Sequence, residues 1–421
     1  MGPWKASRLG WIGIVLLLAM LSRYADCATT KISTTDSNLV NGLSPLNWVQ
    51  KTGFICSATG GASMKVGFTG TRLVTLNVDA AVIKTTVAAR YPILSWSVNN
   101  GPAQTRQLAK GDTALVLASD VPDPVIDLYL KGFSPFENRY TGDAPENSVK
   151  ITGFTVDAGG QTKAVLLPAK IWMNIGNSIE SGDGALYAQG QGRPSDDTWA
   201  ASNDGRASYG YLLANHYGYR EVRLAYGGYN WSGGLAGLPK LTDLMDNTTS
   251  TVSRLVAGAF SPRPDVVLIN LGENGVPAKT DVTDALTKLR SRTGPSTKIM
   301  VMIPVSGKGR AVLTDAFNTY KTSAGDSAAF LIDLGTLTFS TADGQHPTAA
   351  GHRTIYNSAL PAFDKLVTVQ TTRVRAAISS FARQSFASGG FDTKGRRISP
   401  RLSPLHRRFM SKRTWIGLGG G

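Results

Sequence analysis

Residues 171–182 read IWMNIGNSIESG, an apolar run that ends in a glycine and is followed by Asn177 and Ser178. From this point on, short apolar runs alternate with segments of helical period. The expected strands are 171–175, 221–225, 266–271, 298–304 and 330–334, and the expected helices lie near 207–217, 238–257, 282–292, 312–323 and 348–365. Strands that alternate with helices and are apolar along their length predict a parallel sheet with helices on both faces. Residues 167–367 are therefore expected to form an α/β domain.

Ser178 follows the first of these strands directly. In open α/β sheets the ligand site lies at the carboxyl ends of the strands. A serine at this place is lifted out of the sheet, and its own backbone N–H points toward the site. Serine is also a favoured N-cap residue of helices. The local stretch alone therefore leaves two roles open for Ser178, a nucleophile and a helix cap.

Two further loops follow strand ends of the same domain. The stretch LAYGGYNWSGG contains Gly227 and Gly228, which let the backbone approach a ligand closely and offer N–H groups. The stretch VVLINLGENG ends in Glu273 and Asn274, and an amide side chain there can donate to a developing oxyanion. Flexible turns are the alternative for both loops. The Lys-Ser/Thr pair of a phosphate-binding loop is missing, which excludes that motif.

The stretch TADGQHPTAAGH places Asp343 three residues before His346. A carboxylate at this spacing in a turn can orient the imidazole and stabilise its cation. Of the four histidines, only His346 has an acidic partner in a loop; the others are His216, His352 and His406. A serine nucleophile needs such a base. The order Ser178, Asp343, His346 thus predicts a catalytic triad, with an Asp-started turn and an incidental histidine as the alternative.

Residues 29–166 have a different pattern. Short stretches of period two, such as SMKVGFTG and VIDLYLKG, are separated by turn signals. Asn100-Gly101 lies between two of them and predicts a hairpin. A second pair of strands is expected on either side of Ala158-Gly159-Gly160. Several short strands with turns between them predict a β-sandwich, here called jelly-roll-like.

The two ends of the chain differ from its body. Lys5 and Arg8 precede an apolar stretch over 9–21 and then small residues, which predicts a signal peptide over 1–28 and a secreted or periplasmic protein. An uncleaved anchor is the alternative, although 13 apolar residues are short for a membrane span, which needs about 20. We expect no stable membrane insertion after cleavage.

The segment 368–421 is a basic, disordered tail in this interpretation, and it either is merely solvated or contacts an anionic surface. From Thr371 onward it has eleven Lys or Arg and one acidic residue, Asp392, so it supplies +10 of the net charge of +15. The remaining body is only mildly basic, and no nucleic-acid partner is expected. The two cysteines, Cys27 and Cys56, predict neither a disulfide scaffold nor a metal cluster, and the sequence does not say whether they pair.

The blocks GNSIESG, GGYNWSGG, GEN and DGQHPTAAGH resemble the four blocks of the SGNH (GDSL-type) hydrolases over about residues 170–365. The resemblance implies a flavodoxin-like three-layer fold and a catalytic set of Ser178, Asp343 and His346. It also implies an oxyanion hole made by the Ser178 N–H, Gly228 and Asn274, although Gly227 or Gly233 could take the glycine's place. Two positions depart from the family: its usual Asp before the serine is Asn177 here, and its usual Asp after the third block's Asn is Gly275.

A β-sandwich ahead of such a domain in a secreted chain resembles carbohydrate esterase family 2. That resemblance implies a serine esterase which removes O-acetyl groups from a polysaccharide or oligosaccharide without a metal or other cofactor. Tyr226, Tyr229 and Trp231 could form a sugar-stacking face in the second block, with core packing as the alternative. The long polar connection SGDGALYAQGQGRPSDDTW is expected to line the cleft.

Two other functions compete with this one. The protein could be a polysaccharide-binding surface protein whose SGNH domain is catalytically idle, which an intact Ser, Asp, His and Asn set argues against. It could also be a lipase or acyltransferase of the same fold. No long apolar lid is found near the site in the sequence, so this interpretation ranks lower.

Overall fold

The computed structural model describes residues 28–369, which lie in one compact unit. The expected signal peptide, except for Ala28, and the basic tail from residue 370 onward lie outside these residues. Within the described part of the chain, no helix is long and apolar enough to cross a membrane.

The N-terminal region consists of two antiparallel sheets, which confirms the β-sandwich. One sheet has the order β2-β3-β10-β5-β8, with β1 added on β10; its strands are β1 (Thr29–Ile32), β2 (Val49–Lys51), β3 (Phe54–Ser57), β5 (Val74–Val78), β8 (Ala114–Ala118) and β10 (Val149–Asp157). The other has the order β11-β4-β9-β6-β7, with β4 (Ser63–Thr69), β6 (Ile93–Val98), β7 (Gln104–Gln107), β9 (Val125–Gly132) and β11 (Gln161–Lys163). Phe68 and Phe154 pack edge to face between the sheets, with ring centroids 5.4 Å apart. Short helical turns at α2 (Ser37–Gly42), η2 (Ala80–Val82) and η3 (Ala88–Arg90) connect the strands.

The two strand pairs predicted in this region have different outcomes. Strands β6 and β7 form the expected hairpin, with Asn99 and Asn100 at positive φ in its loop. The segments on either side of Gly159 are also strands, β10 and β11, but each pairs with a strand of a different sheet. Their connection therefore crosses the edge of the sandwich and does not close a hairpin.

The C-terminal region contains the predicted parallel sheet, in the order β13-β12-β18-β19-β20. Its strands are β12 (Ile171–Gly176), β13 (Arg220–Ala225), β18 (Val266–Asn270), β19 (Lys298–Met302) and β20 (Ala329–Ile332). Counted within this region the order is 2-1-3-4-5, the flavodoxin-like arrangement that the resemblance implied. The first strand therefore lies between the second and the third, and the loops after these strands meet at one edge.

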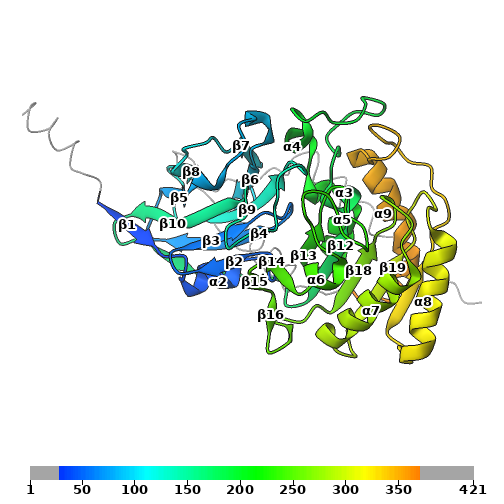
Figure 1. Ribbon diagram of the computed structural model, residues 1–421. Coiled ribbons are helices and arrows are strands. Elements are labelled where there is room, and N and C mark those ends of the chain that lie inside the picture. The colour runs from blue at the N-terminus through cyan, green and yellow to red at the C-terminus, as the bar shows by residue number, and fades with distance from the viewer. Residues whose placement is uncertain (1–27, 370–421) are drawn as a thin grey trace, which may run out of the picture. The chain divides into compact units, whose positions relative to one another are not determined.

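Helices cover both faces of this sheet (Figure 1). Val267 and Ile269 of β18 pack in one core with residues of α7 (Lys279–Thr293) and α8 (Arg310–Ala324). Val266 and Leu268 point the other way, into a second core with residues of α5 (Tyr209–Tyr217) and α9 (Ala349–Phe363). This alternation, with both sides apolar, explains why the strands are apolar along their whole length.

One predicted helix, over 238–257, is wrong. The segment has a single helical turn, α6 (Leu241–Leu244), followed by two small hairpins built from β14 (Asn247–Thr249) with β15 (Val252–Ser253) and β16 (Leu255–Val256) with β17 (Ala259–Phe260). The run NTTSTV is rich in residues of low helix propensity. The buried Arg254 guanidinium also donates to three backbone carbonyls, those of Leu46, Leu244 and Asn247, and these contacts hold the loop in place.

The sandwich and the α/β region are joined by buried and half-buried polar contacts. Arg206 of the short helix η4 (Gly205–Ala207) pairs with Asp127 of β9 at 2.6 Å, and the Tyr129 hydroxyl donates to Asp204 at 3.1 Å. Asn47 donates to the carbonyl of Arg223 in β13 at 2.6 Å. These contacts fix the connection after β9, which carries Pro135 and Phe136, against the α/β region.

Candidate active site

Ser178 begins the short helix α3 (Ser178–Ser181) directly after β12, and its side chain is buried. The cap of this helix is Asn177, not Ser178: the Asn177 side chain accepts from the Ile179 N–H at 2.9 Å. Glu180 completes the cap by accepting from the Asn177 N–H at 3.0 Å. The Ser178 hydroxyl is therefore not used as a cap and is available for chemistry.

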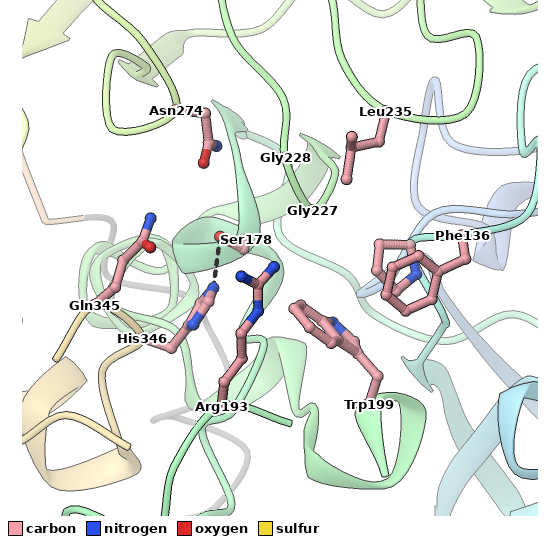
Figure 2. A pocket seen from close by; sticks show the side chains of 11 residues that line it. Phe136, Ser178, Arg193, Trp199, Gly227, Gly228, Leu235, Asn274, Gln345 and His346 are labelled. Atoms are coloured by element: carbon pink, nitrogen blue, oxygen red, sulfur yellow. Dashed lines mark hydrogen bonds between the residues drawn. The ribbon is translucent and has the colours of Figure 1, made fainter. Parts of the chain in front are cut away.

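The structure brings Ser178, His346 and Asp343 together in a hydrogen-bonded chain. The distance between Ser178 Oγ and His346 Nε2 is 3.0 Å (Figure 2). His346 Nδ1 lies 2.7 Å from Asp343 Oδ2. With Nδ1 donating to the carboxylate, Nε2 is the acceptor for the serine proton. The three side chains have the connectivity of a nucleophile, a base and its orienting acid.

The Asp343 carboxylate stays ionised in its turn. Burial raises its pKa, but the hydrogen bonds from the backbone N–H and the ring of His346 outweigh burial and leave this pKa below its ordinary value. The second carboxylate oxygen accepts from the backbone N–H groups of His346 at 2.7 Å and Gln345 at 3.0 Å. These bonds fix the carboxylate, and through it the imidazole, while the edge of Trp199 packs on the His346 ring at 5.8 Å.

The predicted oxyanion donors surround the same serine. Gly228 and Asn274 line a pocket of about 120 Å³ together with Ser178 and His346. In Figure 2, Asn274 and Gly228 lie on the opposite side of Ser178 from His346. Gly227 also lines this pocket, whereas Gly233 does not. Of the glycines that the sequence left open, only the adjacent pair at 227 and 228 is thus placed to donate.

The two oxyanion loops are tied to each other. Asn274 Nδ2 donates to the Tyr229 carbonyl at 3.0 Å, which orients the amide and leaves its second hydrogen for a ligand. In return, Asn230 Nδ2 donates to the Gly275 carbonyl at 2.9 Å. Gly275 has a φ of +152°, and a Cβ there would lie 3.0 Å from Asn230 Nδ2. A glycine at 275 therefore allows this cross-link to form.

The aromatic residues proposed for sugar stacking lie elsewhere. Tyr229 and Trp231 are fully buried in the core between the sheet and α7 and α8, and neither lines the pocket. The Tyr229 hydroxyl donates to the Pro239 carbonyl at 3.0 Å, and the Trp231 indole donates to the Leu271 carbonyl at 3.1 Å. Tyr226 is buried in the same core. All three belong to the core-packing alternative, since their rings complete the packing beneath the loop.

Other residues fill the place that was assigned to these aromatics. The pocket is also lined by Pro135, Phe136, Arg193, Trp199, Leu235 and Gln345. Arg193 and Trp199 lie in or at the end of the polar connection that was expected to line the cleft. Phe136 comes from the connection after the sandwich strand β9, and no sequence signal pointed to it.

A buried carboxylate supports the wall of the pocket. Asp183 accepts hydrogen bonds from Ser181 at 2.7 Å, from Asn203 at 2.8 Å and from the Trp199 indole at 3.0 Å. Burial raises the pKa of Asp183, and these donors together with nearby His346 and Arg139 act in the opposite direction. Asp183 thus holds Trp199 against the His346 ring. No group of three or more His, Cys, Asp or Glu that could hold a metal occurs within residues 28–369.

Comparison with known proteins places this geometry in context. Residues 173–359 match the GDSL-like lipase/acylhydrolase family. The fold is similar to that of a family two carbohydrate esterase from Cellvibrio japonicus, with 15% identity, a TM-score of 0.63 and coverage of 80% of this chain and 98% of that chain. An acetyl xylan esterase from the rumen bacterium Butyrivibrio proteoclasticus is similar at 17% identity, with a TM-score of 0.61 and coverage of 80% and 98%.

A third structure with this fold has a different printed activity. It is a salicylyl-acyltransferase from a tetracycline biosynthetic pathway, with 14% identity, a TM-score of 0.54 and coverage of 81% of this chain and 100% of that chain. A search of curated proteins finds no match. At these identities the structural likeness establishes the fold, with the sandwich included.

Proposed function

We propose that the chain is a serine esterase which removes O-acetyl groups from a carbohydrate. The premise is that residues 173–359 match the GDSL-like lipase/acylhydrolase family and that the fold, with its β-sandwich, is similar to that of family 2 carbohydrate esterases. One observation carries the proposal: the hydrogen-bonded chain from Ser178 to His346 to Asp343 opens into a pocket with Gly228 and Asn274 on its other side.

In this mechanism the Ser178 hydroxyl attacks the ester carbonyl while His346 Nε2 takes its proton. Asp343 holds the ring in the required tautomer and stabilises its positive charge. The N–H groups of Ser178 and Gly228 and the Asn274 amide bind the oxyanion of the tetrahedral intermediate. His346 then passes the proton to the departing sugar hydroxyl, and water releases acetate from the acylated serine by the same steps in reverse roles.

The size of the pocket supports a small acyl group. Its volume of about 120 Å³ is well below the roughly 300–1,000 Å³ of sites that enclose drug-sized ligands. The rim supports a carbohydrate as the alcohol part, because Phe136 beside the pocket is 39% exposed and its exposed ring atoms give a sugar an apolar surface to pack on. Two of the structures with a similar fold are named as carbohydrate or xylan esterases, which agrees with this choice.

The location of the protein is part of the proposal. An N-terminal signal peptide would bring the esterase to extracellular or periplasmic polysaccharides, and the basic segment after residue 370 would hold it near anionic surfaces. Comparing the intact chain with one that ends at Val369 for retention on an anionic polysaccharide resin tests the second part. Equal retention of both forms would refute a role of the tail in binding.

The central test uses Ser178→Ala. We expect this variant to lose nearly all hydrolysis of p-nitrophenyl acetate and all acetate release from a panel of acetylated polysaccharides, while its unfolding transition stays cooperative. Ser306→Ala is a matched control, since Ser306 is an exposed serine in the loop after another strand, β19, and lies outside the pocket. Undiminished hydrolysis by Ser178→Ala would refute the assignment, and a preference for long acyl chains would replace the acetyl esterase by a lipase-type activity.

A further inference from the structure

Arg193 is an arginine in the active-site pocket whose guanidinium has no acidic partner. It lies over the ring of Trp199, with Cζ 5.3 Å from the centroid, and it is exposed. Within residues 28–369 it forms no ion pair, in contrast to Arg90, which pairs with Asp196, and Arg206, which pairs with Asp127. Because the guanidinium is exposed and has no carboxylate partner among these residues, its fork of N–H donors is available to a ligand.

The segment that carries Arg193 is fixed to the catalytic turn. The N–H of Gly190 donates to the Thr341 carbonyl at 3.0 Å, and the N–H of Gly192 donates to the Ala342 carbonyl at 2.8 Å. Ala342 directly precedes the catalytic Asp343. On the other side of Arg193, Pro194 is buried. The base of the Arg193 side chain is therefore held in a defined position next to the catalytic histidine.

A salt bridge strengthens this position from the sandwich. Asp196, three residues after Arg193, pairs with Arg90 at 2.5 Å, and Arg90 also pairs with Glu137 at 3.5 Å. Asp196, the acidic residue nearest to Arg193 in the sequence, is thus engaged by Arg90, and the neighbouring exposed Asp197 forms no ion pair with Arg193. The guanidinium therefore stays available at the pocket.

The lining of the pocket contains one permanent charge, and it is positive. Apart from Arg193, the residues that line it are apolar, glycine, hydroxyl, amide or imidazole residues, and no carboxylate is among them. Asp183 lies behind the wall, where three donors occupy it. The pocket thus offers N–H donors and a cation, a set that suits an anionic group on the substrate.

The position of Arg193 within the pocket indicates which part of the ester would carry the anionic group. The leaving oxygen must lie beside His346, because it receives its proton from that ring, whereas the carbonyl oxygen faces Gly228 and Asn274. Figure 2 shows the Arg193 guanidinium between His346 and Trp199, across Ser178 from Asn274. Arg193 is therefore placed toward the alcohol part of the ester, which in the proposed function is the sugar.

We propose that Arg193 is a specificity-determining residue that binds a carboxylate on the sugar, so that the preferred substrate is an acetylated polysaccharide containing uronic acid. This inference rests on the proposed function and adds the substrate class. The planar guanidinium can take a carboxylate through two parallel hydrogen bonds, and its stacking on Trp199 orders the side chain before the substrate arrives.

The test compares two substrates that differ by one charge: an O-acetylated galacturonic acid glycoside and its methyl ester. We expect the wild type to hydrolyse the free acid with a kcat/KM about tenfold higher than that of the methyl ester. Arg193→Gln should bring this ratio close to one, and Arg193→Lys should restore part of it, because the charge returns without the bidentate geometry. At about 1 M NaCl the preference of the wild type should shrink, since screening weakens a contact that begins in solvent.

Arg353→Gln is the matched control. Arg353 is an exposed arginine of α9 with no ion pair among the described residues, and it does not line the pocket. Arg353→Gln should keep the wild-type ratio of kcat/KM for the free acid to kcat/KM for the methyl ester. If Arg193 had a purely structural role, Arg193→Gln would lower both kcat/KM values and leave their ratio unchanged. A wild type without preference, or an Arg193→Gln variant that keeps the preference, overturns the inference. Hydrolysis of p-nitrophenyl acetate that depends on Ser178 would then still support the esterase, whereas loss of that dependence would refute the proposed function itself.

Discussion

Glu180, two residues after Ser178, makes the stability of the protein depend on pH. Its carboxyl group is buried, accepts from the Asn177 N–H at 3.0 Å and accepts from the Tyr209 hydroxyl at 2.6 Å. Burial raises the pKa of Glu180 from 4.5 to about 7, and the two hydrogen bonds oppose this rise. Tyr209 in turn accepts from Asn270 at 2.7 Å, so the side chains hydrogen-bonded around this carboxyl group are neutral.

The sign of the effect follows from proton binding. Between pH 4.5 and 7 the unfolded chain has released the Glu180 proton and the folded protein still holds it, so the free energy of unfolding falls as the pH rises. The rise of about 2.5 pH units, from 4.5 to about 7, corresponds at 1.36 kcal/mol per unit to about 3 kcal/mol. This contribution is fully present below pH 4.5 and is lost as the pH approaches the folded pKa.

Glu180→Gln removes this titration and keeps an oxygen that can accept from Asn177. We expect the difference in free energy of unfolding, wild type minus variant, to fall by about 3 kcal/mol between pH 4.5 and 7, measured by urea unfolding at several pH values. Asp284→Asn removes one carboxylate from an exposed position on α7 and is the control. Its free energy of unfolding, plotted against pH, should run parallel to that of the wild type. Parallel curves for the wild type and Glu180→Gln would refute the reasoning, because the buried carboxyl would then ionise as it does in the unfolded chain.

Three further predictions concern the pocket and the core beneath its loop. Asn274→Ala removes a donor from the pocket, and kcat on p-nitrophenyl acetate should fall by about 10²–10³; wild-type turnover would exclude Asn274 from the oxyanion hole. Gly228→Ala places a Cβ 2.6 Å from the Leu235 side chain, at a backbone φ of +71° that disfavours alanine, so kcat should fall. Adding Leu235→Ala removes the clash and should restore only the part of kcat that the clash had cost. Complete recovery of kcat would show that the backbone conformation at 228 does not matter. Trp231→Phe leaves the buried Leu271 carbonyl without its donor and opens a small cavity, so it should cost about 2–4 kcal/mol in unfolding with KM for acetylated polysaccharide unchanged, whereas a raised KM would return Trp231 to substrate binding.

The sequence predicted the parallel sheet well because strand burial on both faces leaves a strong apolar signal. All five strands begin within one residue of the expected positions, and the order of the sheet follows the implied fold. The helix expected over 238–257 failed because tertiary contacts of Arg254 with backbone carbonyls decide that segment. The contact with the Leu46 carbonyl joins positions 208 residues apart, and a local pattern does not contain it.

That the candidate site residues lie together was predictable for a related reason. Ser178, Asn274 and the Asp343–His346 pair each follow a strand end, and the sheet order then brings those ends together. The walls of the pocket were not predictable in this way. Phe136 comes from the sandwich connection, and Tyr229 and Trp231 turn inward because the loop after β13 packs its large rings into the core. Aromatic composition alone does not distinguish a ring that faces a ligand from one that fills the core.

The two departures from the family pattern, Asn177 and Gly275, fit one structural logic. Asn177 accepts from the Ile179 N–H with its oxygen, and its amide nitrogen lies 3.5 Å from the Asn270 carbonyl at the end of β18. An aspartate could make the first contact but has no hydrogen for the second. At Gly275 the absence of a side chain lets Asn230 reach the backbone carbonyl. In both places an acidic side chain is replaced by a neutral amide contact between loops. The loops that carry the proposed oxyanion donors, Gly228 and Asn274, are therefore linked by hydrogen bonds between neutral groups, and such contacts suit a place where negative charge would develop.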